Sequence, residues 1–379
     1  MKAYTEHIFD CGDRYFDALI EDIRQAQTSI EIEIYAFQID PLGQTIIETL
    51  IHAAQRGVHI RILVDGAGTP NWGGPQVQAL DQAGIESKVF HPLPWRLSQF
   101  NRTVSKKPWI TNIIHFLTKI NSRNHRKIII IDDTITYIGS RNIDQRHLST
   151  ARGGHAWRDT TIRLSNAPIE ALKLAFETSW SNQSYLLKQQ LNRHFKSLMT
   201  GRLIHLNDSH YLRRSRHQQL LKRIARAKER VWITSAYFIP NHFLLKKIKE
   251  AAHSGIDVRI LVPHASDVPI ISWASESFYH SLRQSGVRIF EYLPSMLHAK
   301  TLIIDQWVLV GTSNFNHRSI LHDLEVDIAL TDPKSRETII QHFKKDLNHT
   351  QEILNPGLQR RPWIKRILGR LCLIIKYVI

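Results

Sequence analysis

The segments HRKIIIIDDTITYIGSRN, at 125–142, and HAKTLIIDQWVLVGTSN, at 298–314, decide the fold that this sequence predicts. Each begins with the pattern His-x-Lys-x4-Asp, continues through an apolar run, and ends in Gly-x-x-Asn. An apolar run without polar alternation is typical of a strand buried on both faces. Each segment therefore predicts a hairpin of buried strands, whose return brings an asparagine back beside the histidine and the lysine.

The sequences that precede these two segments also repeat. SIEIEIYAFQI (29–39) and GVHIRILVDG (57–66) in the first half correspond to RVWITSAYF (230–238) and GIDVRILVPH (255–264) in the second. A helical run joins the two strands in each half. Because strands alternate with helices before the hairpin, we predict an α/β fold: a duplicated αβα sandwich, whose halves are related by a pseudo-twofold axis with the active site at their interface.

The repeat also sets the domain boundaries. We predict a first half over 1–181, a linker over 182–206, a second half over 207–354, and a basic, apolar tail over 355–379. The first half is longer by an insertion of roughly 25 residues, which falls at about 95–124.

The paired motif supplies the candidate catalytic residues. They are His125, Lys127, Asp132, His298, Lys300 and Asp305. The histidine and the lysine of each motif lie two positions apart, so on a strand they project from the same face. The aspartate lies past the apolar run on the opposite side, which favours a structural role in the turn that follows.

Two such half-sites facing each other suit a phosphodiester. The lysines, with Asn142 and Asn314 and the hydroxyls of Ser140 and Ser313, would bind and support the phosphate oxygens. One neutral imidazole would attack phosphorus, and the other would protonate the leaving alkoxide and later deprotonate the acceptor hydroxyl. Because the lysines supply the positive charge, we expect no metal and no cofactor.

A carboxylate should fix the tautomer of each imidazole. Asp159 and Glu325 occupy similar places after the two motifs and are the candidates. The alternatives are ordinary exposed acids at these two positions, a zinc site at the histidines, and histidines that merely fill the core. Lysine two residues from each histidine disfavours a metal cation, and the register of the repeat disfavours a core role for the pair.

The doubled HxKxxxxD pattern with its trailing Gly-x-x-Asn resembles the phospholipase D superfamily. SIEIEIYAF, RGVHIRILVDG, SAYFIP, FEYLPSMLHAK and SNFNHRS are similar to bacterial cardiolipin synthases, especially the shorter type without N-terminal transmembrane helices, over residues 5–350. The resemblance implies a phosphatidyltransferase that makes cardiolipin from phosphatidylglycerol and a second phospholipid through a phosphatidyl-histidine. It also implies His125 as the nucleophile and His298 as the acid and base.

Three departures from the family pattern concern substrate preference more than chemistry. Gly-Ser replaces the usual pair of glycines in the first segment, the hairpin of the second half is one residue tighter, and the insertion at 95–124 is longer than usual.

The charge points to a polyanionic partner, since the formal net charge is +16. The segments 95–124 and 360–379 each carry six Lys or Arg and no acid, interleaved with Trp, Leu and Ile. This composition is typical of a segment that lies on an anionic membrane surface, although a solvated basic face remains the alternative. We therefore expect phospholipid substrates and a membrane-surface partner. Nucleic acid is not required, and neither is an oligomer, because the duplication supplies the twofold.

The composition limits where in the cell the protein is expected to be located. Cys11 and Cys372 form neither a disulfide framework nor a metal-type spacing, which indicates a reducing compartment. The first residues contain acids where a signal peptide has its apolar run, and no segment reaches about 18 uninterrupted apolar residues. The expectation is a peripheral protein on the cytoplasmic face of the cell membrane. A hydrolase or nuclease of the same superfamily is the main functional alternative, and a degenerate repeat that only binds lipid or DNA is the other.

Overall fold

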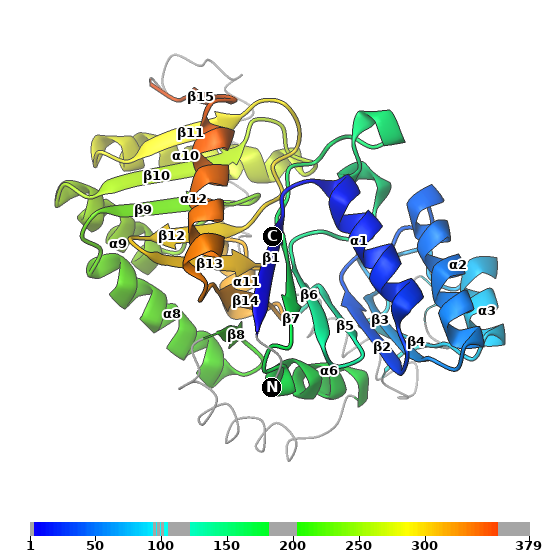
Figure 1. Cartoon of the computed structure of the whole chain (residues 1–379). Helices are drawn as coiled ribbons and strands as arrows, with labels where there is room; N and C mark the ends of the chain where they lie inside the picture. Colours follow the sequence, from blue (N-terminus) through cyan, green and yellow to red (C-terminus); the bar gives the residue numbers. More distant parts are fainter. Residues whose placement is uncertain are drawn as a thin grey trace.

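The computed structural model describes residues 4–93, 96, 99, 102–104, 122–181 and 203–354. Two mixed sheets form its centre (Figure 1). In spatial order the first sheet contains β1 (Thr5–Phe9), β7 (Thr161–Ser165), β6 (Ile135–Gly139), β5 (Ile128–Ile131), β2 (Ser29–Ile34), β3 (His59–Asp65) and β4 (Glu86–Phe90). The second contains β15 (Thr350–Glu352), β11 (Arg288–Tyr292), β10 (Asp257–Pro263), β9 (Arg230–Thr234), β12 (Thr301–Ile304), β13 (Trp307–Gly311), β14 (Val326–Ala329) and β8 (Ile204–Leu206).

The two sheets have the same topology. The order β1-β7-β6-β5-β2-β3-β4 matches β8-β14-β13-β12-β9-β10-β11, and β15 is an additional edge strand. In each sheet three strands run parallel, and the first strand of the hairpin, β5 or β12, pairs antiparallel with one of them. The second strand of the hairpin, β6 or β13, pairs antiparallel with the first. The predicted duplicated α/β fold is therefore confirmed.

Helices cover both sheets on their outer faces and fill the space between them (Figure 1). They are α1 (Gly12–Gln25), α2 (Pro41–Gln55), α3 (Pro75–Gln82), α6 (Glu170–Ser181), α8 (His210–Ala225), α9 (His242–His253), α10 (Pro269–Gln284), α11 (His317–Leu321) and α12 (Pro333–Leu347), with 3-10 turns at Gln145–His147 and Thr150–Arg152. The repeat extends to the capping residues. Asp40 accepts the Gly43 N–H at the start of α2, and Asn241 accepts the Leu244 N–H at the start of α9, each at 2.9 Å.

The apolar hairpin strands are buried on both faces. Ile129 and Ile131 of β5 pack into the outer core of the first half, whereas Ile128 and Ile130 pack into a central core that both halves share. On the other side of that central core lie residues such as Ile303 of β12. This arrangement explains why the run of isoleucines lacks polar alternation, and it joins the halves into one unit.

One predicted boundary, the end of the linker, overlaps a strand of the second half. The predicted linker, 182–206, overlaps β8, which pairs antiparallel with β14 and belongs to the second half. A strand of three residues is too short for its periodicity to stand out. The rest of that linker, 182–202, and the predicted tail, 355–379, lie outside the described residues. The predicted insertion, 95–124, is described only at 96, 99, 102–104 and 122–124.

Two cations in the described part of the insertion pair with carboxylates of the protein itself. Arg123 is buried, donates to the carbonyl of His91 at 2.8 Å, and lies 3.8 Å from a carboxylate oxygen of Asp65. Arg102 forms an ion pair with Asp81. Two of the six cations therefore neutralise carboxylates of the protein itself, and they do not add to attraction for anionic lipid.

Candidate active site

The site lies where the two halves meet, and a backbone exchange between them forms its frame. The His125 N–H donates to the carbonyl of Leu324 in the second half at 3.0 Å. Conversely, the His298 N–H donates to the carbonyl of Arg158 in the first half at 2.8 Å. Each motif histidine is thus held by the chain segment that carries the acid of the other half.

Close packing at two glycines brings those acids into place. Gly139 ends β6, and a Cβ at this position would lie 2.5 Å from the carbonyl oxygen of Thr160. Gly311 ends β13, and its Cβ would lie 2.4 Å from the carbonyl oxygen of Val326. Only glycine permits these approaches. The residues that precede Thr160 and Val326 are the two candidate carboxylates, which the close approach directs into the site.

The carboxylates pair with the histidines crosswise. His125 Nδ1 lies 3.1 Å from both carboxylate oxygens of Glu325, and His298 Nδ1 lies 2.8 Å from Oδ2 of Asp159. Both acids are completely buried. A carboxylate at Nδ1 holds the proton there, which leaves Nε2 of each ring with a free lone pair. The structure therefore places each candidate acid beside one motif histidine, and each of these pairs spans the two halves.

The ring pKa values agree with neutral imidazoles. Burial lowers the pKa of His125, and Glu325 opposes the shift. Burial, followed by the charge of Lys300, lowers the pKa of His298 to about 4. Despite burial, the charges of the facing histidines and the hydrogen bonds to them hold the pKa values of Asp159 and Glu325 below their usual range. Without a bound anion, each pair at neutral pH is thus a neutral ring beside a carboxylate.

The two lysines complete the half-sites. Lys127 Nζ donates to the carbonyl of His125 at 2.8 Å, and Lys300 Nζ donates to that of His298 at 2.5 Å. Burial lowers the pKa of Lys127 to about 7, and the charge of Lys300 contributes to the shift. Burial also lowers the pKa of Lys300 to about 8. The charge of one half-site therefore acts on the other, and an anion between them would stabilise both protonated lysines.

Hydroxyl groups hold the carboxylates from behind. The Ser140 hydroxyl donates to Asp159, and the Thr312 hydroxyl donates to Glu325 at 2.5 Å. Ser313, which the sequence grouped with Ser140, points elsewhere and accepts a hydrogen bond from Arg216 at 2.7 Å. Thr312 was missed, although aligning Gly-Ser-Arg-Asn with Gly-Thr-Ser-Asn would have found it. Both hydroxyls support an acid, and neither is placed as a phosphate ligand.

The asparagines are fixed by their backbones and, in the first half, by the side chain. The Asn142 Oδ1 accepts the Ala36 N–H at 3.2 Å. The backbone N–H of Asn142 donates to His147 Nε2, and that of Asn314 donates to the hydroxyl of Ser319, each at 3.3 Å. Both carboxamides are buried beside their half-sites.

His147 and Ser319 occupy equivalent positions, five residues after each asparagine, and sequence reasoning missed both. The Ser319 hydroxyl donates to Glu325 at 2.6 Å. His147 accepts at Nε2 and therefore carries its proton on Nδ1, which lies 3.6 Å from Asp159 Oδ2. Burial lowers the pKa of His147 to about 3. The two half-sites thus support their acids differently, with an imidazole in one and a hydroxyl in the other.

One group of side chains has the composition of a metal site. Ligand atoms of His147, Asp159 and His298 all lie within 4.8 Å of one another. The positive charges of Lys300 and Arg141 act on the same group. These charges disfavour a divalent cation there, as does the hydrogen bond that already joins His298 to Asp159.

Asp132 and Asp305, which the sequence grouped with the catalytic residues, lie at the far ends of β5 and β12. Asp132 accepts the backbone N–H groups of Gln27, Thr28 and Ser29 at 2.7 to 3.0 Å. The Asp305 carboxylate likewise accepts three successive backbone N–H groups, at 228–230. Both residues begin the hairpin turn with positive φ, near 50°. Their role is to close the turn onto the neighbouring strand, as the direction of the side chain favoured.

Replacing Asp132 by asparagine should lower the free energy of unfolding by about 2 kcal/mol, because a charged acceptor of three N–H groups is lost. Burial opposes ionisation, but the backbone hydrogen bonds hold the pKa of Asp132 below its usual value. The stabilisation should therefore be present above the unfolded-state pKa and be lost as the pH falls through the lowered one. Urea unfolding at several pH values measures this.

The matched control is Asp133→Asn in the same turn. Asp133 also has positive φ, but its carboxylate only pairs with Lys173 at an exposed position. Its replacement should change the stability by less than about 0.5 kcal/mol. Equal effects of the two substitutions would contradict the turn-closing role of Asp132.

The fold and the residues at its centre define the phospholipase D class. The family described as "Cardiolipin synthase, PLD-like domain" matches residues 19–153 and 220–347, and the chain belongs to this family. The cardiolipin synthase of Halalkalibacterium halodurans is 33% identical over 377 residues, covering 96% of this chain and 70% of that protein. That of Staphylococcus aureus strain Mu50 is 33% identical over 374 residues, covering 96% and 71%.

Solved structures share the fold at low identity. Phosphatidylserine synthase from Haemophilus influenzae Rd KW20 matches with a TM-score of 0.68 and 14% identity, covering 99% of this chain and 95% of that one. Polyphosphate kinase from Porphyromonas gingivalis matches with a TM-score of 0.61 and 12% identity, covering 99% and 56%. The predicted family and enzyme class are confirmed: the chain is a phosphatidyltransferase of the phospholipase D family that acts on phospholipids.

Proposed function

We propose that the chain forms cardiolipin from phosphatidylglycerol and a second phospholipid through a covalent phosphatidyl-histidine. The first step requires a second proton on His298, at Nε2, which the negative charge of the bound phosphate favours. In that step the Nε2 lone pair of His125 attacks phosphorus, the bond from phosphorus to the glycerol oxygen breaks, and His298 donates its Nε2 proton to that oxygen. In the second step His298 takes the proton of the acceptor lipid's hydroxyl, whose oxygen attacks phosphorus, and the bond to His125 breaks.

The observation that carries this proposal is the crossed pairing of two imidazoles with two buried carboxylates. A nucleophilic imidazole needs its proton on Nδ1 and its lone pair on Nε2, and Glu325 sets this tautomer for His125. The carboxylate also stabilises the positive charge that the ring gains when it binds phosphorus. Lys127 and Lys300 stabilise the charge that builds on the non-bridging oxygens.

The assignment of His125 as nucleophile rests on the resemblance of its motif to the first motif of the family. Its side chain is 12% exposed, against 5% for His298, which supports readier access of the first lipid. Mass spectrometry of peptides from enzyme quenched during turnover, without exposure to acid, should find the phosphatidyl adduct on the peptide that contains His125. An adduct on His298 would reverse the two roles.

Product analysis tests the activity. Purified protein is incubated with phosphatidylglycerol vesicles, and the lipids are identified by mass spectrometry. Cardiolipin with an equal amount of glycerol supports the proposed transfer. Phosphatidic acid as the main product would instead make water the acceptor, and cleavage of DNA without any lipid product would make the chain a nuclease.

The activity should fall as the pH rises from 7 to 9. The pKa of Lys127 is about 7 and that of Lys300 about 8, because both are buried. Above these values the free enzyme loses the protons that attract the substrate phosphate. Bound phosphate raises both pKa values, so kcat/KM should fall by at least about tenfold while kcat changes less. Initial rates on phosphatidylglycerol in mixed micelles measure this, and a flat kcat/KM profile over this range would contradict it.

We also propose that the chain works at the membrane surface. No helix within the described part of the chain is long and apolar enough to span a bilayer. The basic, apolar segment 360–379, which lies outside the described residues, carries six cations and no acid and supports attachment to anionic lipid. The low cysteine content supports the cytoplasmic face.

A chain that ends at Gln359 should bind anionic vesicles at least about tenfold more weakly, because each lost cation near an anionic surface removes about 1 kcal/mol of attraction. Flotation with vesicles of phosphatidylglycerol and phosphatidylcholine measures the bound fraction. A chain with the six cations replaced by glutamine separates charge from apolar burial. Undiminished flotation of the truncated chain would remove the tail from membrane attachment.

A further inference from the structure

The two halves fill one region of their fold differently, and the repeat makes the comparison direct. In the first half an aromatic cluster packs between α1 and the sheet. Tyr15 lies at its centre, with ring centroids 6.0 Å from Phe9, 4.7 Å from Phe16 and 5.7 Å from Tyr137. All four rings are at most 5% exposed. These rings fill the space between α1 and the sheet, so that α1 packs closely on the sheet.

The repeat register identifies the equivalent positions in the second half. Phe9 pairs with Thr161, which also pairs with Gly139, whereas His205 pairs with Asp327, which also pairs with Gly311. His205 therefore replaces Phe9. By the same pairing of the hairpin strands, Leu309 of β13 replaces Tyr137 of β6.

The helix register gives the other two positions. Ile23 of α1 and Ile224 of α8 are both buried, and their carbonyls accept the N–H of Ala26 and Ala227 at the corresponding helix ends. Counting back from them, Arg216 replaces Tyr15 and His217 replaces Phe16. The second half thus has no Phe or Tyr ring at any of these four positions.

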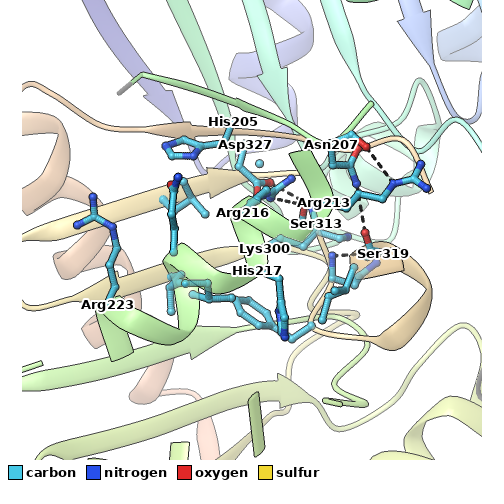
Figure 2. Close-up of a pocket in the computed structure, with 18 of the residues that line it drawn as sticks. His205, Asn207, Arg213, Arg216, His217, Arg223, Lys300, Ser313, Ser319 and Asp327 are labelled. Atoms are coloured by element: carbon cyan, nitrogen blue, oxygen red, sulfur yellow. Dashed lines mark hydrogen bonds and ion pairs between the residues drawn. The ribbon is translucent and has the colours of Figure 1, made fainter. Parts of the chain in front are cut away.

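The residues that replace the rings line a pocket. It has an empty volume of about 800 Å³, including its open mouth, and it lies between α8 and strands β8, β12, β13 and β14 (Figure 2). His205, Arg216, His217 and Leu309 all line it. The loss of the aromatic cluster therefore accounts for the pocket.

One part of the pocket is basic. Apart from Lys300 of the half-site, its lining includes Arg213, Arg216 and Arg223, and Asp327 is the one carboxylate among the described residues that line it. Asp327 forms an ion pair with Arg216, and Arg213 donates to two backbone carbonyls, at 2.8 and 2.9 Å. Nearby acids such as Asp208 and Glu325 also act on Arg213. Three arginines still line the pocket against one lining carboxylate, an arrangement that would attract an anion.

His217, which lines the pocket, adds a further donor. Its Nε2 lies 3.2 Å from the side-chain amide nitrogen of Asn241 and accepts from it, so the proton lies on Nδ1. Nδ1 is buried and has no hydrogen-bond partner among the described residues. A buried N–H of this kind requires an acceptor, and a phosphate oxygen would satisfy it.

The other part of the pocket is apolar and leads to the active site. Leu220, Leu302, Trp307, Leu309 and Phe315 form this wall, which suits a hydrocarbon chain. Lys300 and Asn314, both of the second half-site, line the same pocket. A molecule in the pocket would therefore lie beside the motif of His298.

We propose that this pocket binds the acceptor phospholipid, with its own phosphate against the arginines and His217, and one acyl chain along the apolar wall. The inference rests on the proposed function, because joining two phospholipids brings two phosphates to one site. Lys127 and Lys300 serve the phosphate that reacts. The second phosphate, which does not react, needs a separate set of cations, and the pocket supplies one beside the histidine that deprotonates the acceptor.

The proposal is tested by replacing residues that line the pocket with the equivalent aromatic residues of the first half, which should fill it. The full chain with His217→Phe and Leu309→Tyr gains two of the missing rings, and Arg223→Gln removes a cation without filling space. Arg214→Gln, an exposed arginine on the same helix that does not line the pocket, is the matched control. Thermal unfolding establishes that each variant is folded.

Binding is measured by calorimetry in a His125→Ala background, which prevents turnover. Short-chain phosphatidylglycerol, sn-glycerol 3-phosphate and inorganic phosphate are the probes. We expect the filled variant and Arg223→Gln to bind the short-chain lipid at least about tenfold more weakly, with Arg214→Gln unchanged. The lipid should bind more tightly than either soluble phosphate. Equal affinity for all three probes, or unchanged lipid binding in the filled variant, would overturn the proposal.

Kinetic measurements on chains that retain His125 separate the pocket proposal from the proposed function. The filled variant should raise KM for the acceptor lipid about tenfold while the rate of phosphatidyl transfer to water stays within about twofold. Cardiolipin synthesis with an unchanged acceptor KM in this variant would end the pocket proposal alone. If the unaltered chain makes no cardiolipin but the refilled pocket still loses lipid binding, the proposed function fails and the lipid site remains.

Discussion

Replacing either motif histidine by alanine is expected to reduce turnover of phosphatidylglycerol by at least about 10⁴-fold. His125 and His298 have separate tasks in the proposed mechanism, so neither ring can substitute for the other. Neither His125→Ala nor His298→Ala removes a structural contact of the sheet cores, so the thermal unfolding midpoint should change by only a few degrees. Lipid mass spectrometry on the purified variants measures the loss of product.

The matched control for these substitutions is His264→Ala. His264 Nδ1 also pairs with a carboxylate, Glu291, at 2.8 Å, but the pair lies outside the active site. Its loss should leave turnover within about twofold of the unaltered chain. Residual activity above about 1% in either motif variant would contradict a two-histidine mechanism.

The second large effect is expected from Glu325→Gln, which should lower kcat by about 10³-fold. The amide keeps the shape of the side chain, but its NH₂ group can face His125 Nδ1 and force the proton to Nε2. That tautomer lacks the lone pair needed for attack. Nitrogen-15 NMR of labelled histidines should show the change for His125 while the signal of His298 keeps its Nδ1 proton.

Asp159→Asn should produce the converse result, with the change confined to His298. Glu291→Gln, at the His264 pair, is the control that removes a histidine-paired carboxylate without loss of turnover. If Glu325→Gln altered the ring of its own half, His298, the crossed pairing in the structure would be wrong.

Sequence patterns predicted the fold because the same signals occur twice. A single run such as IIII at 128–131 is compatible with a buried strand or a buried helix, but its return in LII at 302–304, with a matching Gly-x-x-Asn, indicates a duplicated hairpin. The small strands were not predicted. β8 and β15 have only three residues each, and their hydrogen bonds to other strands define them, which no local pattern reveals.

The sequence predicted which residues form the site, but it did not predict which acid pairs with which histidine. The motif spacing gave both histidines and both lysines, and the position after each motif gave Asp159 and Glu325. That each acid serves the histidine of the other half is a property of how two surfaces meet, and no sequence period contains it. His147 is a further example, because it is equivalent to Ser319 and a repeat comparison finds no shared residue type there.

The exchange of acids between the halves constrains how such a chain can be divided. A break between Ser181 and Leu203 would give two polypeptides, each with a histidine and a lysine but with its imidazole unsupported. Neither fragment should have activity alone, whereas mixing the two should restore it as the carboxylates reach their rings. A substitution of one acid would act across the halves in the same way. A fragment that lacks its acid would leave the histidine of the other fragment without its carboxylate, while its own histidine would still be held by the acid of the other fragment.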